Sequence, residues 1–463
     1  MGKEKKLFLL AVMTVMMSTA GYSAQIPVGK DENKSNPTEK VLEVGDETGV
    51  DNKGTFTNNG TINVKTDKTT GVFGILNNAG TSTNNGTIKT EKENKGTAIK
   101  VSKGELKNSG TITNGDKILI ENGKFVNEKG GTVTNDTTGK ITITGGEFTN
   151  NTGGTVNNAG EVIISGGTFN NAGGTITNSG KVSISGGKLT SGKGIITNNT
   201  GGIIDITSSK DIASLKDTEG SLGLKGELIN KEGATINITS SGNNSVGIQQ
   251  MTSTGTLTND GKINITSSGN NAIGINIKNG VFTNNKDIDI TVSGGNANTS
   301  GIKQDAKDGK TENNGIINIT ASNGAGILVS NGEFENNNKI IVNQGTGIKV
   351  ISANGNFFNT SIIEVNGKDA IGIQTANNEK ATVNNDGNII VSGEGAIGMN
   401  AYNTGTVINK EKIFVGEASG SAAKGSSGIK ASKTGKAQND GIIYVNGKDS
   451  IASNGGLGEM AEL

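Results

Sequence analysis

The chain has 463 residues and carries 43 basic and 43 acidic side chains, so its formal net charge is zero. It contains no Arg, which removes the usual basis of a nucleic-acid-binding surface. Because Cys and His are absent as well, the sequence excludes disulfides, zinc sites of ordinary composition and nucleophilic systems of the Ser-His-Asp or Cys-His type.

Gly supplies 74 residues, whereas hydrophobic residues make up 31% and aromatic residues 3% of the chain. A conventional globule of this composition would bury too little apolar surface to offset the entropy of the chain. Disorder is the alternative, but the apolar residues recur in short alternating strings, such as TINITSS from Thr235 and KITITGG from Lys140. Disordered tracts do not require such alternation, which is typical of strands. The sequence therefore predicts an ordered all-β protein.

Residues 1–24 have the organisation of a secretory signal peptide. A basic segment ends at Lys6, an apolar run covers Leu7–Met17, and small residues follow, which favours cleavage after Ala20 or Ala24. A membrane anchor is the alternative, but the apolar run is shorter than the roughly 20 residues that a spanning helix needs. We therefore predict that the mature protein is secreted.

Residues 25–51 hold both prolines, Pro27 and Pro37, and a charged run from Lys30, so we predict a flexible leader or an N-terminal cap. After this segment, residues 52–454 consist of related strings that contain Asn and Gly. Examples are GTFTNNGTINV from Gly54 and GTLTNDGKINI from Gly255. This change of pattern marks the beginning of a repeat domain.

The repeats are about 25 residues long and vary in length. The best internal match pairs INITSSGNNSVGI from Ile236 with INITSSGNNAIGI from Ile263. The Asn of the turn recurs through the second half at 23 to 29 residue steps, at Asn230, Asn259, Asn284, Asn313, Asn336, Asn359, Asn384 and Asn409. Irregular spacing without helical periodicity favours a solenoid whose coils have loops of different length.

One repeat divides into three short strands. In the unit from Gly255 these are TLT, KINIT and AIGINI, separated by NDG and SSGNN. Alternation points one set of residues inward and leaves Thr, Asn and Lys facing water. We expect the inward set to be Leu257, Ile263, Ile265, Ile273, Ile275 and Ile277. The predicted fold is an all-β, right-handed parallel β-helix of three strands per coil and roughly 16 coils, with the handedness taken from the preference of parallel crossovers.

Like residues should stack on like in such a solenoid. Phe125, Phe148 and Phe169 occupy the same place in successive repeats, as do Phe334 and Phe357, so we predict internal aromatic columns rather than a binding surface. The Asn-Asn-Gly and Asn-Asp-Gly corners are explained by positive φ, which Gly adopts freely and Asn tolerates, and by hydrogen-bonded ladders of Asn amides between coils.

The repeat pattern breaks at Ser208–Gly226 and at Gly416–Gly428, which we predict to be protruding loops. Residues 455–463, GGLGEMAEL, form a C-terminal tail.

Carboxylates are the remaining source of catalytic chemistry. Asp287 and Asp289 alternate outward around Ile288, as a pair of acids in a glycoside hydrolase could, but a solvated strand face is the simpler interpretation. The string GKLTSGKG from Gly187 approximates a phosphate loop, yet it ends in Gly instead of Ser or Thr and lies inside the repeats. We therefore predict no catalytic, cofactor-binding or metal-binding residues, no cofactor and no enzymatic activity.

A signal peptide, a short leader and repeats such as GTFNNAGGTITNSG from Gly167, poor in aromatics and free of Cys, resemble the passenger domains of type V secretion autotransporter adhesins, especially the Asn/Gly-rich passengers of fusobacteria. The resemblance covers nearly the whole mature chain. It implies a protein at the surface of a Gram-negative bacterium that acts as an adhesin or structural rod, with a host or bacterial surface protein or glycan as its partner and no nucleic acid.

Autotransporters end in a membrane β-barrel, whereas GGLGEMAEL follows the last repeat of this chain directly. The resemblance then implies that contact with the outer membrane depends on a barrel not present in this chain. Two alternatives remain: an enzyme acting on polysaccharide, and a truncated passenger fragment without function.

Overall fold

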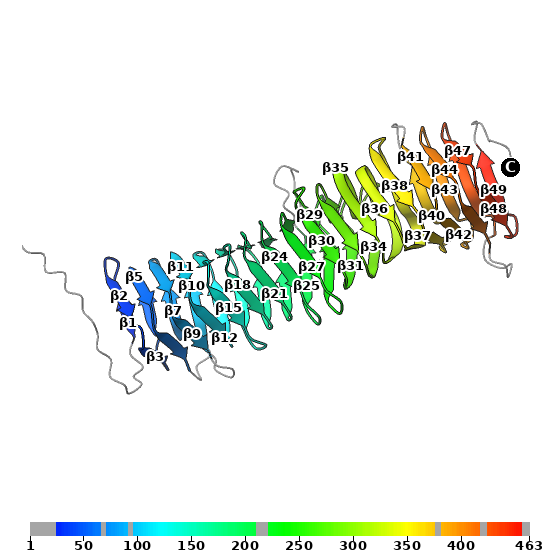
Figure 1. Ribbon diagram of the computed structural model, residues 1–463. Coiled ribbons are helices and arrows are strands. Elements are labelled where there is room, and N and C mark those ends of the chain that lie inside the picture. Colours follow the sequence, from blue (N-terminus) through cyan, green and yellow to red (C-terminus); the bar gives the residue numbers. More distant parts are fainter. Residues whose placement is uncertain are drawn as a thin grey trace, which may run out of the picture.

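The computed structural model describes residues 25–65, 71–90, 96–209, 221–375, 381–416 and 424–455. These residues form an elongated rod in which short strands stack along the axis, with the N-terminal coils at one end and the C-terminal coils at the other (Figure 1). Strand pairing is parallel and joins each strand to its counterparts in the neighbouring coils. The chain is thus a β-solenoid of about 16 turns, and its described residues include no helix. The predicted parallel β-helix is confirmed, while its right-handedness stays a prediction.

The strands stack into three parallel sheets that run the length of the rod. Three long strands bend around corners and join more than one sheet: β35 (Ser300–Asn313), β36 (Ile316–Asn336) and β37 (Lys339–Val350). The other strands belong to one sheet each.

Sheet 1 also contains β1 (Ile26–Val28), β4 (Val50–Asn52), β7 (Phe73–Asn77), β10 (Thr97–Val101), β13 (Lys117–Ile120), β16 (Lys140–Ile143), β19 (Glu161–Ile164), β22 (Lys181–Ile184), β25 (Ile203–Ser208), β28 (Thr235–Ser240), β31 (Lys262–Ser267), β34 (Ile288–Val292), β39 (Ile362–Val365), β42 (Asn388–Val391), β45 (Lys412–Val415) and β48 (Ile442–Val445).

Sheet 2 also contains β2 (Asn33–Asn36), β5 (Thr55–Asn58), β8 (Thr81–Asn84), β11 (Glu105–Asn108), β14 (Lys124–Asn127), β17 (Glu147–Asn150), β20 (Thr168–Asn170), β23 (Lys188–Thr190), β26 (Leu222–Leu224), β29 (Val246–Gln250), β32 (Ile273–Ile277), β40 (Ile371–Thr375), β43 (Ile397–Tyr402), β46 (Ser427–Ser432) and β49 (Ile451–Gly455).

Sheet 3 also contains β3 (Val41–Val44), β6 (Thr61–Val64), β9 (Thr87–Thr90), β12 (Thr111–Asn114), β15 (Thr132–Asn135), β18 (Thr155–Asn158), β21 (Thr175–Asn178), β24 (Ile195–Asn198), β27 (Glu227–Asn230), β30 (Thr256–Asn259), β33 (Val281–Asn284), β38 (Gly355–Asn359), β41 (Thr382–Asn385), β44 (Thr406–Asn409) and β47 (Lys436–Asn439).

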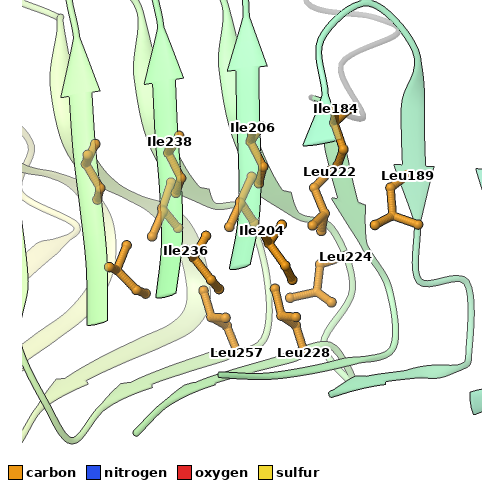
Figure 2. Close-up of a cluster of buried hydrophobic side chains, with 14 of the residues drawn as sticks. Ile184, Leu189, Ile204, Ile206, Leu222, Leu224, Leu228, Ile236, Ile238 and Leu257 are labelled. Carbon is orange, nitrogen blue, oxygen red and sulfur yellow. The ribbon is translucent and has the colours of Figure 1, made fainter. Parts of the chain in front are cut away.

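The core is a continuous apolar column enclosed by the three sheets. Ile and Leu side chains from different sheets meet at the centre of the rod, as Figure 2 shows for Ile204 and Ile236 of sheet 1, Leu222 of sheet 2 and Leu228 of sheet 3. The six inward residues predicted for the unit from Gly255 are all buried, and their strands are β30, β31 and β32. Five of them lie in the apolar core, but Ile273 does not: the next residue, Gly274, has the inward position, since a Cβ there would lie 2.2 Å from the Ile265 side chain. Period-two alternation therefore assigned all but one of these inward positions.

The coil structure begins earlier than the sequence boundary at residue 52. Strands β1, β2 and β3 lie within residues 25–51 and pair with β4, β5 and β6 of the next coil. Leu42 and Val44 are buried in the same core as the later coils. Pro27 lies in β1, a strand with a single neighbour, where a missing N–H is tolerated. The segment interpreted as a leader or cap is thus the first coil of the solenoid.

The predicted aromatic columns are present inside the rod. The ring centroids of Phe125 and Phe148 lie 4.5 Å apart, and those of Phe148 and Phe169 lie 4.4 Å apart. Phe334 and Phe357 form a second pair at 5.8 Å. Separations in this range are typical of favourable aromatic contacts.

Replacing Phe148 by Ala is expected to lower the free energy of unfolding by about 3–5 kcal/mol, because it leaves a cavity between the rings of Phe125 and Phe169 that the flanking coils cannot close. Chemical denaturation of the wild type and the variant measures the loss. Phe148→Leu keeps most of the volume and should cost much less, and equal losses for the two variants would contradict a packed aromatic column.

Asparagine ladders occupy the ends of strands and are buried. In the longer one, each amide donates to the carbonyl oxygen of the next Asn at 2.6–2.8 Å. This ladder runs through Asn114, Asn135, Asn158, Asn178, Asn198, Asn230, Asn259, Asn284, Asn313, Asn336, Asn359, Asn385, Asn409 and Asn439. The prediction placed Asn384 in this series, which is wrong by one residue: Asn359 pairs with Asn385, and Asn384 faces outward opposite Phe358.

Positive φ is not the reason for these corner residues. The described asparagines with positive φ are Asn244, Asn271 and Asn403, and none of them belongs to the long ladder. The corner Gly86 is required by close approach, since a Cβ there would lie 2.0 Å from the carbonyl oxygen of Gly60 in the preceding coil. The Asn-Asn-Gly and Asn-Asp-Gly corners are therefore explained by amide hydrogen bonds and tight stacking, whereas longer corners do use positive φ at glycine, as at Gly201 and Gly233.

The signal peptide, residues 210–220 and 417–423 of the two predicted loops, and residues 456–463 of the tail lie outside the described residues. The predicted loops were too wide: Leu222 and Leu224 form β26 and are buried in the core, and Ser427 and Gly428 begin β46. For the residues outside the described ranges, the loop and signal-peptide predictions stay predictions.

Candidate functional site

The outer face of sheet 1 places Asp289 in a network of polar side chains. Its carboxylate lies 2.9 Å from the Lys262 ammonium and accepts a hydrogen bond from Asn318 at 2.7 Å. Burial acts to raise the pKa of Asp289, but the hydrogen bonds from Lys262 and Asn318 outweigh it and hold the pKa below its usual value. Asp289 is thus a fixed anion at neutral pH and is poorly suited to donate a proton.

Asp287, the other acid of the predicted pair, is half-buried and lies just before β34. Neighbouring outward positions of sheet 1 also carry ladders: Asn237 donates to Asp205 and Asn264 donates to Asn237, both at 2.8 Å. The two aspartates therefore belong to a hydrogen-bonded strand surface, which agrees with the simpler interpretation of them.

The string from Gly187 to Gly194 is part of the solenoid wall. Leu189 is buried in the core, and its N–H donates to the carbonyl oxygen of Ser221 at 3.0 Å. The N–H of Ser191 donates to Gly223 at 2.9 Å in the same way. A phosphate loop needs free backbone N–H groups, so this segment cannot cradle a phosphate.

Across the described ranges, no group of three or more acidic side chains is arranged to hold a metal ion, and no helix is long and apolar enough to cross a bilayer.

Three carboxylates gather around one lysine on sheet 3. The Lys310 ammonium lies 2.8 Å from Glu312, 3.0 Å from Glu335 and 3.3 Å from Glu333. The hydrogen bonds that Lys310 donates to Glu312 and Glu335 are the main cause of a pKa of Lys310 above its usual value. Lys310 thus neutralises acids that would otherwise repel one another.

Lys310→Met is expected to lower the melting temperature modestly, by the equivalent of less than about 1 kcal/mol, because the cluster is partly exposed. A raised pKa means that the stabilisation is fully present below pH 10 and is lost only as the pH rises through the raised value. Thermal melts at low and high salt test this, since salt should shrink the difference between the two proteins. A difference that does not change with salt would contradict an electrostatic role.

Sheet 2 carries an outward row that is recessed. Between Val246 and Gly455 its strands place one residue per coil outward next to core positions such as Ile248, Ile275 and Ile302, and the pairing register aligns them. This amide–lysine row consists of Gln249, Asn276, Lys303, Leu328, Lys349, Gln374, Asn400, Lys430 and Asn454.

Several members of the row are buried although they face away from the core. Gln249 is 1% exposed and Asn276 is 3% exposed, whereas Thr266 on the outer face of sheet 1 is exposed. The Lys349 ammonium donates to the carbonyl oxygen of Ala297 at 3.3 Å. The turn before β35, which contains Ala297, therefore lies against part of the row.

The chemistry of the row is cationic and amide-rich. Its lysines are Lys303, which is 3.0 Å from Asp305 at its edge, together with Lys349 and Lys430, and the row itself contains no acid. Burial lowers the pKa of Lys349 below its usual value. The Asn276 amide donates to Gln249 at 3.4 Å, but its Oδ1 is buried and accepts no hydrogen bond. The row thus holds a half-buried ammonium, that of Lys349, and a buried oxygen, Oδ1 of Asn276, that accepts no hydrogen bond.

A shallow hollow lies on sheet 2 nearer the N-terminus, with a volume of about 510 Å³. Stacked glycines of successive turns line most of it, and Lys124, Glu147 and Thr168 stand at its edge. With so few side chains, it offers little basis for specific recognition.

Comparison with known proteins finds one matching family model. Residues 253–423 match the model of the BigA third pectate lyase-like domain, which is less than half of the chain. Among solved structures, the crystal structure of the hyper-glycosylated TibA55-350 fragment, modified by TibC, aligns with 82% of this chain and 100% of that chain. The sequence identity is 16% and the TM-score 0.22, so that alignment supports no conclusion about function. No curated protein matches this chain.

Sequence reasoning missed the amide–lysine row. Its signal is the residue that follows Gly-Ile in strings such as VGIQQ, IGINI, SGIKQ, AGILV and TGIKV. Polar residues and Lys recur at this place, although the neighbouring positions are apolar. Paired acids were the expected sign of a site in this sequence, and the row contains no acid.

Proposed function

We propose that this protein is a secreted, surface-exposed rod of the autotransporter-passenger type that acts through binding. The observation that carries the proposal is the uninterrupted stack of described coils, which presents outward side chains in rows along one axis. A stiff rod of this kind can project from a cell and offer an extended surface to a partner. The match of residues 253–423 to a BigA domain adds support.

Localisation tests the proposal directly. An antibody against the repeats should label intact cells or detect the protein in the medium, and bacteria or beads that display the rod should adhere to surfaces better than those that display none. Protein confined to the periplasm in its native host would contradict a surface role and would favour the truncated-fragment alternative.

A polysaccharide-degrading enzyme is the second candidate, because the matching family model is named pectate lyase-like. We propose that the chain is not such an enzyme, since Asp289 is engaged by Lys262 and Asn318 and the chain contains no Arg. Incubation with polygalacturonate should yield no unsaturated or shortened product. Product formation by the purified protein that Asp289→Asn abolishes would overturn this part of the proposal.

A further inference from the structure

We propose that the amide–lysine row of sheet 2 is a binding site for a linear acidic polysaccharide that lies along the axis of the rod. The inference rests on the proposed surface function and names the class of partner and the face that binds it.

Charge is distributed unevenly over the three sheets in this half of the rod. Several acids with ion-pair partners lie on sheets 1 and 3, among them Asp289, Glu364 and Glu335, whereas sheet 2 carries Asp305, which pairs with Lys303. The charged residues of the row itself are all lysines, although the chain as a whole is neutral. They are Lys349, Lys430 and Lys303, of which Lys303 is paired with Asp305. An anionic partner is therefore attracted to sheet 2 and repelled by acids elsewhere.

The recessed geometry strengthens this preference. The Lys349 side chain is half-buried and its ammonium donates to the carbonyl oxygen of Ala297, so a carboxylate or sulfate placed beside it would gain more than at a fully exposed lysine. The amide of Gln374, which is half-buried and next to Lys349 in the row, can exchange hydrogen bonds with a hydroxyl group. Sugar chains with acidic groups supply both hydroxyls and anions.

Repetition in the row matches repetition in a polymer. Parallel coils are stacked about 4.8 Å apart, so Lys303 and Lys349, two coils apart, are separated by roughly 10 Å along the axis, and Lys430 follows roughly 14 Å further on. The amides of Gln374 and Asn400 fill the positions between the last two lysines. A linear chain could therefore meet hydrogen-bonding groups and cations in alternation.

Binding of the purified protein to immobilised polysaccharides tests the proposal. The probes are hyaluronate, which carries carboxylates, heparin, which also carries sulfates, and neutral dextran as the uncharged reference. We expect binding to the acidic chains, none to dextran, and weakening as salt is added. Comparing hyaluronate with heparin shows whether carboxylates suffice or sulfates are required.

The decisive variant removes the cations of the row with the triple change Lys303→Gln, Lys349→Gln and Lys430→Gln. The matched control changes Lys262, Lys339 and Lys412 of sheet 1 to Gln, which removes the same charge from another face. We expect at least a tenfold loss of affinity for the first variant and less than a twofold change for the control.

Lys430→Glu alone, at a half-buried site near the end of the row, reports on binding even if the triple variant melts early.

Equal losses for both triple variants would mean attraction by overall charge only and would overturn the proposal, as would wild-type binding by the sheet 2 variants. If displayed rods adhere to cells and acidic polysaccharides do not compete, this inference fails while the surface function stands. If the rods neither reach the surface nor adhere, the proposed function fails.

Discussion

Replacing Ile265 by Asp is expected to cost the rod roughly 4 kcal/mol or more of local stability, because it places a carboxylate without a partner in the apolar column. Ile265 is 1% exposed and is paired in register with Ile238 and Ile290 of the adjacent coils. The loss should appear as a lower melting temperature and as faster amide hydrogen exchange in β28, β31 and β34. Since each coil contacts only its neighbours, distant coils should keep their protection.

The control is Lys262→Ala on the same strand. Its side chain is 50% exposed and forms an ion pair with Asp289, so the expected change is below about 0.5 kcal/mol. An unchanged melt of the Ile265 variant would mean that the inward register assigned to this strand is wrong.

Replacing Asn313 by Leu is expected to lower the free energy of unfolding by about 3 kcal/mol, because it interrupts the long ladder in a region closed to water. Asn313 accepts from Asn284 at 2.7 Å and donates to Asn336 at 2.7 Å and to the carbonyl oxygen of Gly315 at 3.0 Å. The substitution leaves two buried acceptors, Asn336 Oδ1 and Gly315 O, without this donor.

Asn314 provides a matched control for this measurement. It is adjacent in sequence, exposed, and donates to Asn285 at 3.1 Å in a surface counterpart of the ladder. Asn314→Ala should change stability by less than about 0.5 kcal/mol, since water replaces the lost bond. Similar losses for the two substitutions in denaturant titrations would show that burial of the ladder contributes nothing.

The core could be predicted from the sequence because the same alternation of inward and outward residues recurs in every coil of a solenoid. Alternation around Ile263, Ile265 and Ile275 assigned strands and inward faces without knowledge of long-range contacts, since each strand pairs with its own repeat. The same rule gave the column through Phe148. The first coil was missed, because prolines and charged residues surround Leu42 and Val44 in the sequence. Both residues nevertheless continue the core.

The corners and the candidate site were harder to predict. Asn384 and Asn385 are adjacent and chemically identical, so only the register shows which of them points inward. The amide–lysine row depends on turns such as the one that brings Ala297 to Lys349, 52 residues later in the chain. Sequence patterns show which residues alternate. They do not show which outward-facing residues are covered by a neighbouring turn.

The near-identical coils that begin at Ile236 and Ile263 have an evolutionary consequence. Their pairing is in register from Thr235–Lys262 through Ser240–Ser267, so either coil could stack on the partners of the other. Gain or loss of one 27-residue unit by recombination would lengthen or shorten the rod by about 4.8 Å and leave the remaining coils paired. The gene can thus adjust how far its product extends, in steps of a single coil, while preserving the fold on both sides of the join.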